Sequence, residues 1–180
     1  MKIAIVCCSL NPDSRSAVLA EQLRDPLAAA DTEIDWVDLR DHPLPLCDGG
    51  AAYGDPVVSA LAARLADADA LLLAVPIYNF AVNAAAKNLV ELTGRGWAGK
   101  VVGVACSAGG RGSYMSAMGL AGSLMLDFRC WVVPRFVYAD DGDFPDAERP
   151  RAVTPALRDR LHDLARDTAR AAAALAPAAR

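Results

Sequence analysis

Three short turns in this chain carry the hydroxyl, aromatic and glycine residues that could bind a small molecule. They begin at Ser9, Pro76 and Ser107, and each directly follows an apolar run. In open α/β sheets, the loops after parallel strands meet at one edge of the sheet, where such folds bind ligands. The three turns therefore predict one shared pocket.

The second and third turns have the residue types needed to hold a flat aromatic ring. Tyr78 and Asn79 could meet the polar edge of such a ring. The glycines of the third turn would let backbone lie against it, because glycine has no Cβ. The residues predicted to line a flavin ring are Pro76, Ile77, Tyr78, Asn79, Phe80, Ser107, Ala108, Gly109 and Gly110.

The first turn, residues 9–16, has the composition of a phosphate-binding loop. The hydroxyls of Ser9, Ser14 and Ser16, with the free N–H groups at the start of the next helix, could hold a phosphate dianion. The guanidinium of Arg15 could add charged N–H donors that bind the phosphate in a bidentate way. An ordinary helix start with Ser14 as the N-cap is the alternative interpretation. FMN combines such a ring with such a phosphate.

The three turns contain no evident acid–base pair or nucleophile. Neither of the two histidines has a metal-ligand neighbour at useful spacing. Arg111 and Gly112 are assigned to substrate binding, where the arginine could hold a nucleotide phosphate. We therefore predict no catalytic side chain and no metal. A flavin carries its own redox chemistry, which the protein only positions and tunes.

The elements that must position these turns alternate regularly between strand and helix. This alternation predicts a flavodoxin-like, doubly wound α/β fold with helices on both faces and one domain over residues 1–180. Its five-stranded parallel sheet would have the order 2-1-3-4-5. Strands are expected over 3–8, 33–39, 69–75, 100–106 and 130–137, the last broken by Pro134. Helices are expected over 14–30, 57–66, 83–94, 112–128 and 154–176.

Composition narrows the class of protein further. The net charge of −4 disfavours nucleic acid as a partner, and no apolar run reaches membrane-spanning length. The five cysteines, an odd number, lie mostly in apolar runs. Such cysteines are typical of free thiols in a reducing compartment, which indicates a cytoplasmic protein.

The chain resembles the NAD(P)H-dependent FMN reductase family of flavodoxin-like proteins. The resemblance rests on the 9–16 loop, the Pro76-Ile77-Tyr78-Asn79 turn followed by Lys87-Asn88, and the Ser107-Ala108-Gly109-Gly110 turn. Ile77 stands where many members have glutamate, which favours the sulfonate-assimilation FMN reductases as the nearest branch. Ala84 stands where many members have glycine, which bears on how loosely FMN is held.

The resemblance implies hydride transfer from NAD(P)H to FMN, with the reduced flavin passed to a partner monooxygenase or another acceptor. The alternatives are an FMN-dependent quinone, azo or metal-oxyanion reductase, a flavodoxin-type electron carrier, and a flavin-free interaction module. A homodimer or homotetramer is also expected, partly from the resemblance and partly from apolar residues predicted at the surface. These residues are Trp97, Tyr114, Met115 and Met118.

Overall fold

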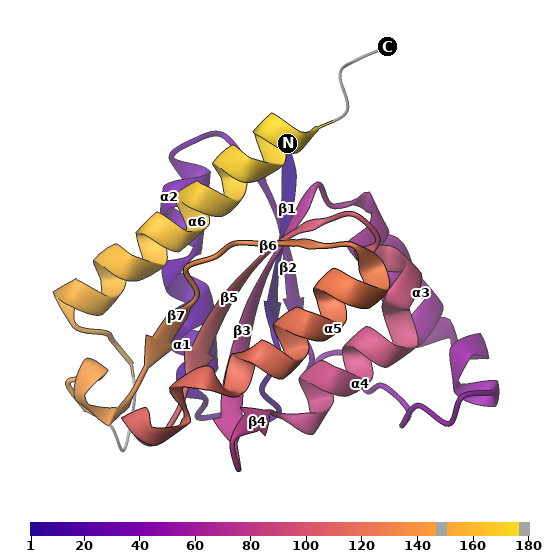
Figure 1. The fold of residues 1–180 in the computed structure, drawn as a ribbon, viewed down its shortest axis with the longest axis horizontal. Coiled ribbons are helices and arrows are strands. Elements are labelled where there is room, and N and C mark those ends of the chain that lie inside the picture. Colours follow the sequence, from indigo (N-terminus) through magenta and orange to yellow (C-terminus); the bar gives the residue numbers. More distant parts are fainter. Residues whose placement is uncertain (147–150, 177–180) are drawn as a thin grey trace.

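The fold, in a computed structural model that describes residues 1–146 and 151–176, is a sheet covered by helices on both faces (Figure 1). The strands of the described part are β1 (Lys2–Cys7), β2 (Glu33–Asp38), β3 (Ala70–Tyr78), β4 (Ala81–Val82), β5 (Val101–Ser107), β6 (Trp131–Val132) and β7 (Val137–Ala139). The α-helices are α1 (Arg15–Gln22), α2 (Arg24–Ala28), α3 (Pro56–Asp67), α4 (Ala84–Thr93), α5 (Met118–Phe128) and α6 (Pro155–Leu175).

The strand order is the one predicted, β2-β1-β3-β5-β6, with all of these neighbours parallel. The number of strands differs from the five predicted. The last predicted strand is divided at Pro134 into β6 and β7, which both pair with β5. In addition, the end of β3 folds back into the short antiparallel strand β4. Proline causes the first difference because it cannot donate a hydrogen bond to the ladder.

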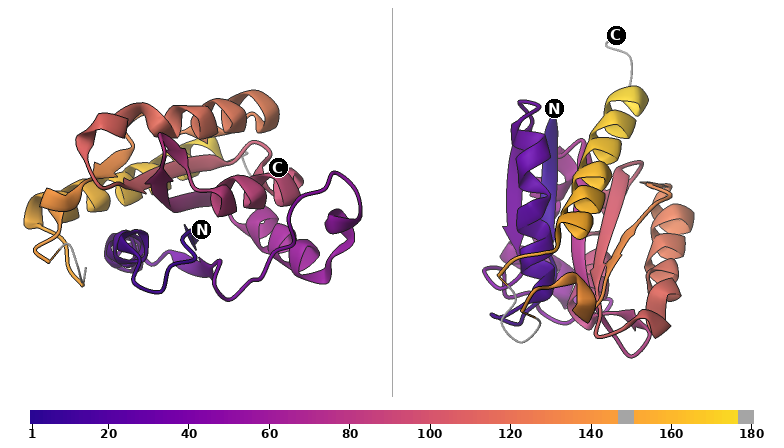
Figure 2. Two further views of the ribbon diagram at one scale, coloured as in Figure 1. Left: turned by 90° about the horizontal axis from the view of Figure 1, so that it is seen from below. Right: turned by 90° about the vertical axis from the view of Figure 1, so that its left-hand side faces the viewer.

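Helices lie on opposite faces of the sheet, as Figure 2 shows in two further views, and each face carries its own apolar core. Alternate residues of β1 serve them: Ile3 and Ile5 face α1, α2 and α6, whereas Ala4 and Val6 face α3, α4 and α5. This period of two follows from strand geometry. Because both faces are covered, the central strands are apolar at almost every position.

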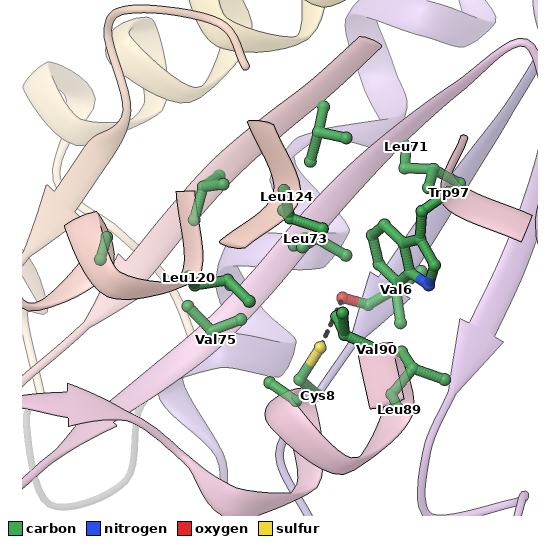
Figure 3. Close-up of a cluster of buried hydrophobic side chains, with 14 of the residues drawn as sticks. Val6, Cys8, Leu71, Leu73, Val75, Leu89, Val90, Trp97, Leu120 and Leu124 are labelled. Atoms are coloured by element: carbon green, nitrogen blue, oxygen red, sulfur yellow. Dashed lines mark hydrogen bonds between the residues drawn. The ribbon is translucent and has the colours of Figure 1, made fainter. Parts of the chain in front are cut away.

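Trp97 lies inside the core between the sheet and helices α3, α4 and α5, and is fully buried (Figure 3). Its indole Nε1 donates to Thr93 Oγ1 at 2.9 Å, which satisfies the ring's polar atom. The prediction that Trp97 contributes to an exposed apolar surface is therefore wrong.

Two predicted helices are interrupted. The helix expected over 14–30 is divided at Leu23, which ends α1 and precedes α2. Pro26 then occupies the first turn of α2, where no backbone N–H is needed. The helix expected over 112–128 begins as a 3₁₀-helix, Arg111–Ala117, before α5.

Candidate functional site

The three predicted turns converge on one pocket at the carboxyl ends of β1, β3 and β5. Its volume of about 400 Å³ falls in the usual range for small-molecule sites. It is lined by Ser9, Asn11, Asp13, Ser14, Arg15, Pro76, Ile77, Tyr78, Ser107, Ala108 and Gly109. The pocket thus joins segments about 100 residues apart in the sequence, because the parallel sheet brings their ends together.

The first wall of the pocket is the loop before α1, and its own hydrogen bonds shape it. Ser9 Oγ accepts from the Asn11 N–H at 3.2 Å, and Asn11 Oδ1 accepts from the Asp13 N–H at 3.0 Å. Ser14 caps α1 by accepting from the Ser16 N–H at 3.1 Å. The positive end of the α1 dipole is therefore directed at the pocket wall, where it favours an anion.

Ser16 does not line the pocket. Its hydroxyl is fully buried and lies 2.7 Å from Ser107 Oγ. This hydrogen bond ties the first turn to the third from behind the pocket wall. Ser16 therefore supports the site rather than facing into the pocket.

Arg15 lines the pocket and is held by the chain segment after β7. Its guanidinium forms an ion pair with Asp141. The same Nη1 lies 3.5 Å from the Ala108 carbonyl oxygen, and the group stacks 5.4 Å from the Phe144 ring centroid. The Arg15 guanidinium thus lines the pocket, but it is already paired with the Asp141 carboxylate.

The second wall is the end of β3, which forms a tight hairpin with β4. Tyr78 pairs with Ala81, so Asn79 and Phe80 form the two-residue tip. Both tip residues have left-handed backbone, with φ of 50° and 63°. These angles fit a type I′ turn, in which asparagine is favoured and phenylalanine is strained. Neither residue lines the pocket, and the Phe80 side chain is 72% exposed.

Asn83 is a structural residue of the site that the sequence did not reveal. Asparagine directly before a helix is a favoured N-cap, but the Asn83 side chain makes no capping bond to α4. Instead, Nδ2 donates to the Cys8 carbonyl at 2.7 Å, and the backbone N–H donates to the Pro76 carbonyl at 3.0 Å. Asn83 thus fastens the end of β1 to the end of β3. Within residues 1–146 and 151–176, its buried Oδ1 has no hydrogen-bond partner.

The third wall is the glycine turn after β5. A Cβ placed on Gly109 would meet no atom within 4 Å, so this wall leaves open space. Gly110 lies outside the lining, and its carbonyl accepts from Tyr138 Oη at 2.6 Å. Tyr138 Oη also contacts Ser113 Oγ at 2.7 Å. Tyr138, which the sequence analysis did not identify, therefore holds the turn in place.

The residues predicted to bind substrate also lie outside the lining of the pocket. Arg111 is exposed, and its Nε donates to Asp140 Oδ2 at 2.6 Å. This hydrogen bond lowers the pKa of Asp140 below its ordinary value. Gly112 follows Arg111 in the 3₁₀-helix. Both residues therefore border the third wall instead of forming it.

The pocket contains little that could transfer a proton. Among the described lining residues, Asp13 is the one carboxylate and there is no histidine. Burial raises the pKa of the nearby Cys106 thiol to about 12, so this group stays protonated at neutral pH. The described residues contain no cluster of side chains suited to a metal ion. Hydroxyls, glycine backbone and one half-exposed tyrosine suit the binding of a phosphorylated aromatic molecule such as FMN.

The described part of the chain contains no helix long and apolar enough to cross a membrane. Known proteins resemble the chain in both sequence and structure. The sequence profile of the NADPH-dependent FMN reductase family matches residues 1–144.

A 2-hydroxy-1,4-benzoquinone reductase from a Burkholderia species is 36% identical over 57% of this chain, and this match covers 55% of that protein. An FMN reductase (NADPH) from Pseudomonas putida is 30% identical over 83% of this chain and 77% of its own length. Among solved structures, an apo-form NADH:FMN oxidoreductase superposes with a TM-score of 0.77 at 18% identity. It covers 94% of this chain and 89% of its own chain, which supports the flavodoxin-like fold.

Proposed function

The chain belongs to the NADPH-dependent FMN reductase family, and we propose that it transfers a hydride from NAD(P)H to FMN. One observation carries the proposal. The pocket joins the amino end of α1, an open glycine wall and a half-exposed tyrosine, and its described lining residues include no acid–base pair. Such a site can hold a cofactor that supplies the reactive atoms itself.

The residues of this chain would act by binding and orienting. Ser9, Ser14 and the first turn of α1 would hold the phosphate, with Arg15 beside them. Pro76, Ile77, Tyr78, Ser107, Ala108 and Gly109 would surround the ring. FMN, when bound, supplies the hydride-accepting chemistry. Asn79, Phe80, Gly110, Arg111 and Gly112 border these walls and would meet the nicotinamide nucleotide or the outer edge of the ring.

The test is oxidation of NADH and NADPH by the purified protein, followed at the nicotinamide absorbance with and without added FMN. FMN-dependent oxidation supports the proposal, and stopped-flow reduction of bound FMN by NAD(P)H alone separates a reductase from an electron carrier. Protein that neither binds FMN nor oxidises either nucleotide would contradict the proposal. FAD and riboflavin titrations would define which flavin the pocket accepts.

A second candidate is reduction of quinones by the same flavin site. It is supported by the similarity to the Burkholderia protein, whose name gives a hydroxybenzoquinone as its substrate. Steady-state rates with FMN held at a catalytic level and a benzoquinone in excess would separate the two candidates. Turnover that follows the quinone concentration and needs no excess FMN would favour the quinone reductase.

Three finer assignments complete the proposal. The protein would work in the cytoplasm, because its five cysteines form no disulfide and four of them are buried. It would form a homodimer or homotetramer through exposed apolar residues. Reduced flavin would leave for a flavin-dependent monooxygenase, which mixing with such an enzyme and an NAD(P)H supply would test.

A further inference from the structure

The charge balance at the phosphate end of the pocket is unusual for an anion site. Among the lining residues that the structure describes, Arg15 is the one cation and Asp13 is a carboxylate. Asp141, which is not among the lining residues, forms an ion pair with the Arg15 guanidinium, so this cation is already paired with a carboxylate. A phosphate group would add a charge of roughly −1.5 to −2 at neutral pH.

The contact between Arg15 and Asp141 is built from two partly exposed side chains on different elements. Arg15 is the first residue of α1, and Asp141 follows β7 in a short 3₁₀-helix, Asp141–Asp143. The side chains are 24% and 55% exposed, respectively. A guanidinium has five N–H donors in a fixed fork and binds carboxylate and phosphate in the same way. Both anions therefore suit the same group.

We propose that Asp141 determines flavin specificity by competing with the flavin phosphate for the Arg15 guanidinium. This inference rests on the proposed flavin site. The competition lowers the preference of the pocket for FMN over riboflavin, which has the same ring and ribityl chain without the phosphate. Asp141 thus acts through Arg15 as a positioning residue and is not itself a catalytic one.

The test uses Asp141→Asn, which removes the charge and keeps the shape of the side chain. The backbone contacts of this turn remain, including the bond from the Phe144 N–H to the Asp141 carbonyl. FMN and riboflavin affinities would be measured by flavin fluorescence titration of the apoprotein. The matched control is Asp163→Asn, which removes the same charge from an α6 pair with Arg166 outside the pocket.

We expect Asp141→Asn to raise the ratio of FMN affinity to riboflavin affinity by about threefold to tenfold. This change in affinity lies between the effect typical of losing an exposed ion pair and that of losing a charge-assisted hydrogen bond. The riboflavin affinity and the ratio in the control should stay within about twofold, and the gain should shrink at high salt because ions screen it.

A double-mutant cycle tests whether the effect passes through Arg15. In an Arg15→Gln background, Asp141→Asn should change the ratio by less than about twofold, because no guanidinium remains to be released. An unchanged or lower ratio in Asp141→Asn, or an equal rise in both backgrounds, would overturn the inference. If the wild-type protein binds neither flavin, the proposed function itself fails, and the two failures are thereby distinguished.

Discussion

At the scale of single residues, Gly109 is the position where the pocket depends most directly on the absence of a side chain. A Cβ there would meet open space and not protein atoms, so a larger side chain would project into the pocket without disturbing the fold. We expect Gly109→Leu to weaken FMN binding by at least about tenfold through steric exclusion.

Flavin fluorescence titration would measure this effect, with thermal unfolding as the check on folding. Gly54→Leu is the matched control, since a Cβ there also meets open space but the residue ends the 3₁₀-helix Ala51–Gly54, outside the pocket lining. Normal FMN affinity and turnover in Gly109→Leu would place the ring elsewhere.

The residues that line the pocket were more predictable than the residues that hold it together. Ser9, Tyr78 and Gly109 lie at or just after the ends of apolar strands, and the edge of a parallel sheet gathers such residues. Asn83 and Tyr138 act through contacts with Cys8 and Gly110, far away in the sequence. Asn83 also precedes a helix, so its local pattern indicated a cap. Long-range polar contacts leave no local pattern that could distinguish them.

At the scale of elements, the packing of α6 on β5 depends on a glycine. A Cβ on Gly103 would lie 2.5 Å from Thr168 Oγ1 and 2.7 Å from Leu72 Cδ2. Gly103→Ala should therefore lower the free energy of unfolding by about 1–3 kcal/mol, as overpacked cores do.

Urea unfolding followed by circular dichroism would measure the loss. Gly122→Ala is the contrasting variant, because it lies within α5 and its Cβ meets no atom within 4 Å. There, alanine should raise stability by about 0.5–1 kcal/mol, since glycine is costly inside a helix. Equal effects of the two substitutions would show that the close approach at Gly103 is unimportant.

The link between β2 and the phosphate loop should make stability depend on pH. Burial raises the pKa of Asp38, but hydrogen bonds from Arg40 outweigh it and hold this pKa below its ordinary value. Arg40 Nη1 also reaches the Pro12 carbonyl at 3.3 Å. Ionised Asp38 therefore stabilises the fold fully above its ordinary pKa of about 3.9, and this contribution is lost as the pH falls through the lowered value.

Asp38→Asn should cost about 1–3 kcal/mol of unfolding free energy at neutral pH, because a buried charged hydrogen bond is lost. The difference from wild type should narrow in acid. Denaturant unfolding from about pH 7 to about pH 2 would measure it. Asp167→Asn, which breaks an exposed pair with Arg170, should cost less than about 1 kcal/mol at every pH. A constant cost for Asp38→Asn across this range would contradict the argument.

The order of the elements was predictable, whereas their interruptions were not. Apolar runs indicated the places of β1, β3 and β5, because strands covered on both faces have few polar positions. The division of the first helix at Leu23 and the return of β3 into β4 have no comparable apolar pattern to indicate them. Phe80 in left-handed backbone illustrates the limit, since phenylalanine does not indicate a turn.

At the scale of the whole molecule, an exposed apolar surface lies along the outer side of α5 and the segments beside it. It comprises Tyr114, Met115, Met118, Met125, Leu126 and Trp131. Three of these were expected at an interface from the sequence, whereas Trp97 packs inside. The inward positions of α5, such as Leu120 and Leu124, fill the core, so helical periodicity leaves the outer side uncovered by the described residues.

We expect two copies to associate through this surface, which is the simplest symmetric assembly. Light scattering at micromolar concentration should then give a mass of at least about twice 18.9 kDa. Leu126→Glu should shift the protein toward monomer without unfolding it, because this side chain is 87% exposed and forms no part of the core. Leu46→Glu, at an equally open site in the loop before α3, should leave the mass unchanged. A monomeric wild type would contradict the expected association. Equal effects of the two glutamates would place the contact elsewhere, because a contact through the α5 surface should be weakened by Leu126→Glu alone.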